Sequence, residues 1–182
     1  LQILLDGEEK VEGDVNNKGR KWTAGVKNQI TNSTFPVTVN LVDSCFNWIT
    51  NQSPSGITVK SNDPHGTPST STFLTVGLAN GTTTFYVNSR RAESGREYTA
   101  EKTGLTSDQS SEITVNKDVN DKWLQALIYP EETPLPGDLA NNGKSGTVTT
   151  KTAGSLFNVL VRSVDDCWNL CPTNNPLSLI HI

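Results

Sequence analysis

A thirteen-residue stretch occurs twice in this chain of 182 residues, and this repeat constrains the possible folds more than any other feature. Residues 35–47 read FPVTVNLVDSCFN and residues 157–169 read FNVLVRSVDDCWN. Seven of the thirteen positions are identical, all at one constant offset of 122. A repeat at this spacing predicts that each copy belongs to its own domain and that the domains stand in series.

Each copy of the repeat predicts a strand followed by a turn. In the first copy Phe35, Val37 and Val39 alternate with other residues, and this period of two places one apolar face against a core. Asp43 and Asn47 follow, and such side chains cap their own backbone and accept left-handed dihedral angles. We therefore expect the strand to reverse direction at this turn.

The order of the strand-like segments predicts one complete and one incomplete domain. Residues 1–117 contain seven or eight short alternating segments separated by turn residues, which is typical of an all-β sandwich. Residues 118–123 form a short charged linker, which restricts the angle between neighbouring domains. Residues 124–182 align with the beginning of the first domain only, so we expect the second copy to be truncated.

Three further expectations concern local structure in the first domain. The polar, glycine-punctuated residues 6–19 predict a surface loop. Residues 57–59 predict a partner strand that forms a hairpin with the repeated strand. Tyr98 follows a turn, where a sandwich often has a tyrosine whose hydroxyl group bonds back to the corner.

Composition argues against several classes of function. The net charge of −4 and the isoelectric point near 5.1 argue against a nucleic-acid surface, which would be basic. No apolar run approaches the roughly 20 residues that a membrane-spanning helix needs. His65 and His181 have no nucleophile or metal ligand at an informative spacing, so the sequence predicts no catalytic residue and no cofactor site.

The acidic turns are candidate calcium sites, because calcium binds carboxylate and amide oxygens. The candidate ligands are Asp43 and Asn47 in the first turn and Asp165, Asp166 and Asn169 in the second. Each turn offers about two or three such oxygens, whereas calcium takes roughly six to eight. Capping of the turn is therefore the preferred interpretation, and calcium binding is the alternative.

The cysteines and tryptophans also allow two interpretations. Cys167 and Cys171 could form a local disulfide, or these thiols and that of Cys45 could stay reduced or pair with another chain. The four tryptophans could stack on a sugar, but they are scattered over both domains. We favour a role for Trp168 in covering one end of the core, as Phe46 would in the first copy.

Read in order, five motifs resemble the bacterial immunoglobulin-like (Big, invasin-type) tandem repeats: VTVNLVDSCFN, ITVKS, GTTTFYVN, AESGREYTAEK and SSEITVN. The first copy matches throughout, and the second matches only as far as about Ile180. The resemblance implies an immunoglobulin-like Greek-key β-sandwich in two tandem copies, the second truncated. It also implies a large bacterial protein, secreted or anchored at the surface, in which such domains act as a stalk or adhesin without catalysis.

The sequence thus predicts a non-catalytic structural or adhesive repeat segment at the cell surface or outside the cell. Its expected partners are neighbouring repeats of the same polypeptide, and in addition surface proteins or glycans. The alternative is a carbohydrate- or calcium-binding accessory module of a secreted hydrolase.

Overall fold

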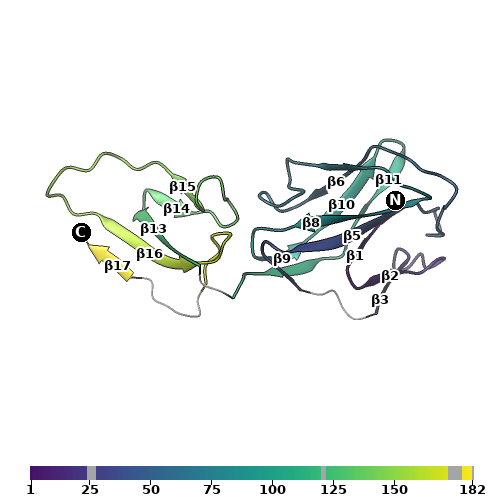
Figure 1. Cartoon of the computed structure of the whole chain (residues 1–182), viewed down its shortest axis with the longest axis horizontal. Helices are drawn as coiled ribbons and strands as arrows, with labels where there is room; N and C mark the ends of the chain where they lie inside the picture. The colour runs from purple at the N-terminus through teal and green to yellow at the C-terminus, as the bar shows by residue number, and fades with distance from the viewer. Residues whose placement is uncertain (24–27, 120–121, 172–177, 182) are drawn as a thin grey trace.

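The computed structural model describes residues 1–23, 28–119, 122–171 and the backbone of residues 178–181. These residues form strands, turns and loops, and no helix occurs among them (Figure 1). No helix that could cross a membrane is therefore found in these ranges. The all-β prediction is confirmed for this part of the chain. Residues 120 and 121 of the predicted linker and the terminal Ile182 lie outside the described residues.

Twelve strands fall in residues 1–117, which we call the first segment. They are β1 (Gln2–Leu5), β2 (Glu8–Lys10), β3 (Arg20–Trp22), β4 (Gln29–Ile30), β5 (Thr34–Asn40), β6 (Ile57–Ser61), β7 (Leu74–Val76), β8 (Thr82–Asn88), β9 (Glu93–Arg96), β10 (Tyr98–Lys102), β11 (Leu105–Gln109) and β12 (Ile113–Asn116).

The second segment, residues 123–182, begins with the first residue of β13. Its strands are β13 (Trp123–Tyr129), β14 (Glu132–Pro134), β15 (Lys144–Gly146), β16 (Asn158–Val164) and β17 (Ser178–His181).

Three sheets of the first segment share one core. Their strand orders are β1-β5-β8, β11-β10-β6-β7 and β4-β12-β9. Val37 and Val39 of β5, Val59 of β6 and Val115 of β12 alternate with more exposed residues and lie fully buried together. Burying such a side chain contributes about 1.5–3 kcal/mol. The arrangement is that of a β-sandwich, with the alternating pattern fixing which face of each strand points inward.

Two of the local predictions are wrong. The expected loop after Leu5 contains a hairpin of β2 and β3, in which Glu9 lies opposite Lys21. The expected hairpin of β5 and β6 does not form, because β5 pairs with β1 and β8 whereas β6 pairs with β10 and β7. Alternation specifies the buried face of a strand but not its neighbour, so strands in facing sheets give the same pattern as a hairpin.

The Tyr98 hydroxyl group bonds back to an earlier residue, as expected, but Glu93–Arg96 before it form β9 rather than a turn. The buried hydroxyl oxygen of Tyr98 lies 2.8 Å from the hydroxyl oxygen of Ser89, and the Tyr98 ring packs edge-on against Phe35. Burial raises the pKa of Tyr98 to about 12, because it disfavours the charged phenolate.

The second segment repeats the three-strand sheet of the first. β16 lies between β13 and β17, as β5 lies between β1 and β8. Val159 and Val161 of β16 are only half-buried, and Leu124 is 77% exposed whereas Leu1 is 8% exposed. The described part of this segment contains no counterpart of the β11-β10-β6-β7 sheet that would cover these side chains.

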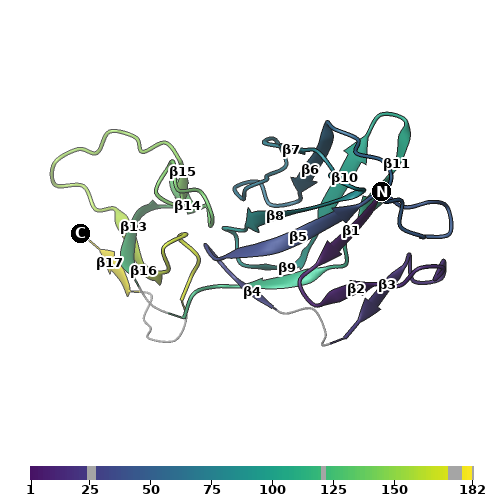
Figure 2. The same cartoon turned by 45° about the vertical axis from the view of Figure 1, so that its right-hand side comes forward.

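The two segments lie end to end. Figures 1 and 2 show the second segment beyond the end of β9 and β12, with the N-terminus near the opposite end of the first segment. The contacts between the segments are therefore made at strand ends and in loops.

Candidate functional site at the junction of the two segments

The turn formed by residues 43–47, which we call the Asp43 turn, is held by its own side chains. Asp43 Oδ1 accepts hydrogen bonds from the backbone N–H groups of Cys45, at 2.8 Å, and Asn47, at 2.9 Å. Asp43 Oδ2 accepts one from Asn47 Nδ2, also at 2.9 Å. These bonds, chiefly those from Asn47, lower the pKa of the Asp43 carboxyl group.

The turn formed by residues 165–169, the Asp165 turn, has the same structure. Asp165 Oδ1 accepts from the backbone N–H groups of Cys167, at 2.8 Å, and Asn169, at 2.9 Å. Asn169 Nδ2 lies 3.1 Å from both carboxylate oxygens. The fourth residue of each turn is left-handed, with φ of +62° at Phe46 and +63° at Trp168. The predicted capping role is confirmed for the pair Asp43 and Asn47 and for the pair Asp165 and Asn169.

A glycine in a neighbouring loop packs closely against each turn. A Cβ atom on Gly19 would lie 2.6 Å from the Cβ of Phe46, and one on Gly143 would overlap the Cβ of Trp168. Both glycines also have positive φ angles. The close approach of the loop to the turn therefore requires glycine at both positions.

A buried glutamine holds that loop in each segment. Gln2 Nε2 donates to the carbonyl groups of Lys18 and Gly19, at 3.0 and 2.8 Å. Gln125 Nε2 donates in the same way to the carbonyl groups of residues 142 and 143, at 2.8 and 2.9 Å. The second segment thus repeats these loop hydrogen bonds of the first segment as well as those of the turn.

The surroundings of the two turns differ. Asp43 and Asn47 are exposed, whereas Asp165 is 0% and Asn169 3% exposed. The second turn is buried because it contacts the first segment. We call this set of contacts the junction.

The Asp165 carboxylate makes two polar contacts across the junction. Its Oδ2 atom accepts from the hydroxyl group of Thr31, at 2.8 Å, and from the backbone N–H of Asp118, at 3.2 Å. Thr31 follows β4, which pairs in parallel with β12, and its N–H donates to the carbonyl of Asn116 at 2.8 Å. This pairing places the hydroxyl group of Thr31 beside Asp118, which follows the same strand.

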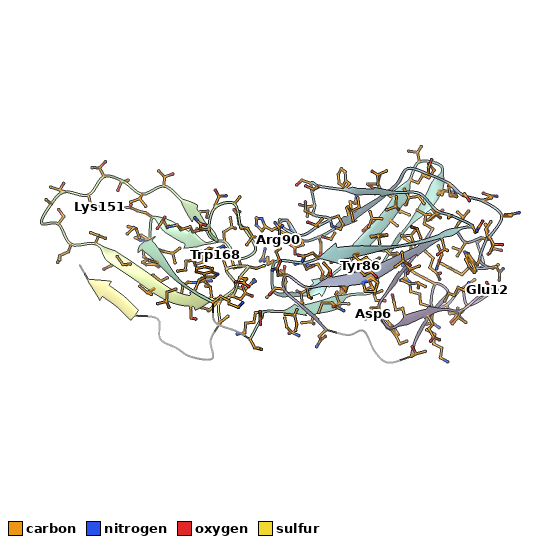
Figure 3. All side chains as sticks on the ribbon, in the orientation of Figure 1. Asp6, Glu12, Tyr86, Arg90, Lys151 and Trp168 are labelled. Carbon is orange, nitrogen blue, oxygen red and sulfur yellow. The ribbon has the colours of Figure 1, made fainter. Side chains whose placement is uncertain are left out.

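Asn169 makes two further contacts with the first segment. Its Oδ1 atom accepts from the backbone N–H of Ala92, at 2.9 Å, and its Nδ2 donates to the carbonyl of Arg90, at 2.9 Å. Figure 3 shows Arg90 and Trp168 close together where the segments meet. A Cβ atom on Gly137 would lie 3.2–3.3 Å from atoms of His65 and Arg91, so a second loop also reaches the first segment.

A buried ion pair positions the loop that receives Asn169. Asp63 Oδ2 accepts from the backbone N–H groups of Arg90, at 2.9 Å, and Arg91, at 3.3 Å. The guanidinium group of Arg96 lies 3.7 Å from the same oxygen, and both charged side chains are buried. A buried charge is stable only when it is paired and hydrogen-bonded, so Asp63 fixes this loop strongly.

None of the three cysteines forms a disulfide, and they differ in exposure. Cys45 is exposed in the Asp43 turn, whereas Cys167 and Cys171 are buried near the junction. Burial, and then the Asp165 carboxylate, raises the pKa of the Cys167 thiol to about 12. The suggested disulfide between Cys167 and Cys171 is not formed. Cys171 Sγ instead lies 3.6 Å from the carbonyl oxygen of Asp118.

The candidate calcium ligands are divided between the two turns. Asp43 and Asn47 are not brought together with Asp165, Asp166 and Asn169. Asp166 Oδ1 accepts from the indole N–H of Trp123, and its Oδ2 pairs with Lys122, each at 3.2 Å. In the described ranges, no three His, Cys, Asp or Glu side chains gather in a group that could hold a metal ion.

The tryptophans do not form one platform. Trp123 and Trp168 stack on each other beside the junction, with ring centroids 6.5 Å apart. Lys10 Nζ lies 3.1 Å from the ring centroid of Trp48, covering that face. Trp22 lies elsewhere, in the β2-β3 hairpin.

Comparisons with protein-family models, with curated proteins and with solved structures find no match.

The sequence indicates the two turns but not the groups that the second turn contacts in the first segment and the linker. Ala92 and Arg90 contribute main-chain atoms. Every residue type has these atoms, so the sequence does not indicate that they make this contact. Thr31 contributes its side chain, but nothing in the sequence distinguishes it from the many other threonines. The one available signal is the short linker, which predicts that the ends of the segments lie close together.

Proposed function

We propose that this chain is a segment of a tandem array of bacterial immunoglobulin-like domains, with a non-catalytic structural or adhesive role in a large extracellular or cell-surface protein. The observation that carries the proposal is the repeated turn. It has the same hydrogen bonds in both segments, and in the second segment it is buried against the segment before it.

The junction suits a spacer because it fixes the angle between neighbours. A hydrogen bond to a charged group contributes about 1.5–3 kcal/mol, and the Asp165 carboxylate accepts one from Thr31 of the first segment and one from Asp118 at the start of the linker. With a linker of only a few residues, such contacts favour a semi-rigid rod over two independent domains. Its partners are then neighbouring repeats, and surface proteins or glycans along the sides of the rod. The proposal assigns no catalytic residue and no cofactor.

The rod-like arrangement is tested by measuring backbone ¹⁵N relaxation on the whole chain. We expect the two segments to tumble with one rotational correlation time, because the junction couples them. The matched control is Asp165→Asn, which places an amide where the carboxylate accepts from Thr31 and Asp118 and should uncouple the segments. Two separate correlation times in the unmodified chain would contradict the proposal.

The genetic context provides an independent test. The DNA on either side of this coding region should encode further copies of the 35–47 stretch at spacings of about 122 residues. A catalytic domain after one or two copies would instead favour an accessory module of a secreted hydrolase.

One observation favours that second candidate. Trp22 is 40% exposed and lines a surface hollow of about 570 Å³ together with Asn16, Asn17 and Asp14. An exposed aromatic ring beside amide groups suits a sugar. Quenching of tryptophan fluorescence by oligosaccharides, absent in Trp22→Ala, would support this role. Calcium binding is excluded if the melting temperature does not change at millimolar calcium.

A further inference from the structure

The first segment carries, at its far end, the same groups that the second segment uses at the junction. Asp43 Oδ1 is satisfied within its turn, as Asp165 Oδ1 is. Asp43 Oδ2 differs from Asp165 Oδ2. In the part of the chain that the structure describes, it accepts from Asn47 Nδ2 and from no second residue.

Asn47 occupies the position in the first turn that Asn169 occupies in the second turn. Asn169 uses its Oδ1 and Nδ2 atoms to bind one N–H and one carbonyl group of the preceding segment. Asn47 donates to Asp43, is exposed, and makes no such contact among the described residues. At the junction, Asp165 Oδ2 and Asn169 Oδ1 accept hydrogen bonds that hold the second turn in place. Their counterparts in the first turn, Asp43 Oδ2 and Asn47 Oδ1, belong to exposed side chains.

The neighbouring loop shows the same difference. Gly13 corresponds to Gly137, since each lies next to an aspartate whose carboxylate binds an asparagine three residues later, and both have positive φ. Gly137 lies against the preceding segment, whereas a Cβ atom on Gly13 would meet nothing within 4 Å. Figure 3 places Glu12, beside Gly13, at the end of the first segment that lies away from Arg90 and Trp168.

A hollow beside the Asp43 turn adds apolar surface. It has a volume of about 590 Å³, and its lining includes Leu1, Val42, Phe46 and Leu105 as well as Asp43. A docked partner would cover these side chains together with the polar groups of the turn, which is the usual anatomy of a protein interface.

We propose that the Asp43 turn and the Gly13 loop form a docking surface for the C-terminal end of another domain of this kind. That domain would present a hydroxyl group and two main-chain N–H groups to Asp43 and Asn47, as Thr31, Asp118 and Ala92 do at the junction. The inference rests on the proposed function, because it requires an array in which one domain precedes another. The occupant is a domain rather than a metal ion, since the same oxygens in the second turn receive N–H and O–H donors.

The test uses the reactivity of Cys45. An extended chain carries an added copy of residues 1–123 before Leu1, which keeps the natural spacing because Leu124 corresponds to Leu1. The added copy carries Cys45→Ser, so that one Cys45 remains. The rate of its reaction with a maleimide is measured by peptide mass spectrometry and compared with that in the unextended chain. We expect the rate to fall at least about tenfold, as expected for a docked state that is open a tenth of the time or less.

The matched control is Thr31→Val in the added copy, which removes the donated hydroxyl group and should restore most of the rate. Cys167 in the same molecule reports separately on the existing junction. Fast labelling of Cys45 with slow labelling of Cys167 overturns the docking inference but leaves the proposed function intact. Fast labelling of both overturns the proposed function. Slow labelling of Cys45 that Thr31→Val does not change also overturns the docking geometry.

A second variant tests the inference without an added copy. In the natural chain, Asp166→Ser combined with Trp168→Phe gives the Asp165 turn the sequence of the Asp43 turn. If the Asp43 turn can dock, Cys167 should remain protected to within about threefold, because the groups that cross the junction are unchanged. Labelling as fast as that of Cys45 would show that this turn sequence cannot dock, and would overturn the inference.

Discussion

Removing the hydroxyl group of Thr31 should open the junction without unfolding either segment. Thr31→Val keeps the shape of a side chain that is 4% exposed but deletes its bond to the buried Asp165 carboxylate. The backbone N–H of Asp118 also donates to this hydroxyl group, at 3.1 Å, and it keeps Asp165 as its second acceptor. The substitution therefore removes one charge-assisted hydrogen bond and leaves no buried donor unpaired.

The size of the effect follows from that bond. A hydrogen bond to a charged group contributes about 1.5–3 kcal/mol, and a loss of about 2 kcal/mol raises the open population roughly 30-fold. Because Cys167 and Cys171 lie at the junction and are buried, their rate of alkylation should increase by this factor if both are exposed through opening of the junction.

The assay is alkylation at low denaturant, followed by peptide mass spectrometry. Cys45 serves as the internal reference, because it is exposed in its own turn. Thr38→Val is the matched control. It deletes a hydroxyl group that lies 2.8 Å from that of Thr84 on an exposed face of the first segment, so labelling of Cys167 should not change. An increase of less than about threefold with Thr31→Val would refute the assignment of this bond to the junction.

Three further predictions concern stability. Asp165→Ala should lower the free energy of unfolding by about 3 kcal/mol or more, because it leaves several buried donors unpaired, and Asp43→Ala should cost clearly less because its donors can bind water. Urea titration of the two variants side by side measures the difference, and equal losses would be inconsistent with a buried junction. Gly143→Ala should increase labelling of Cys167 by displacing the turn above it, whereas Gly154→Ala has a positive φ but open space and should cost only about 1 kcal/mol. Between about pH 9 and pH 12 the wild type should lose about 2–3 kcal/mol more stability than Tyr98→Phe. The pKa of Tyr98, about 12 in the folded protein, lies above its usual value, so the unfolded chain ionises first and stability falls as the pH rises. Parallel pH dependence of the two proteins would contradict this.

The fold class and the turns could be predicted because their causes are local. The alternation in β5 reflects the two faces of one strand, and the hydrogen bonds that close each turn join residues at most four positions apart. Both patterns can be recognised in a short run of consecutive residues. The position of the Tyr98 hydroxyl group was also accessible, because its partner Ser89 is only nine residues away.

Strand pairing and the junction could not be predicted because their causes lie far apart in the sequence. Thr31 and Asp165 are separated by 134 residues. The Asp43 and Asp165 turns have nearly the same sequence and the same internal bonds, so nothing within either one shows which is exposed. The difference between them arises from what lies beside them in space.

The junction also bears on how such a chain can evolve. Among the described residues, Asp165 and Asn169 bind the main chain of Arg90, Ala92 and Asp118 and the side chain of Thr31 across the junction. Main-chain groups survive mutation of the residues that carry them, provided that the loop keeps its path. A duplicated copy could therefore diverge widely over its surface and still join its neighbour, so long as Asp and Asn persist at the two ends of the turn. Recombination between copies of quite different sequence would then yield continuous arrays of altered length.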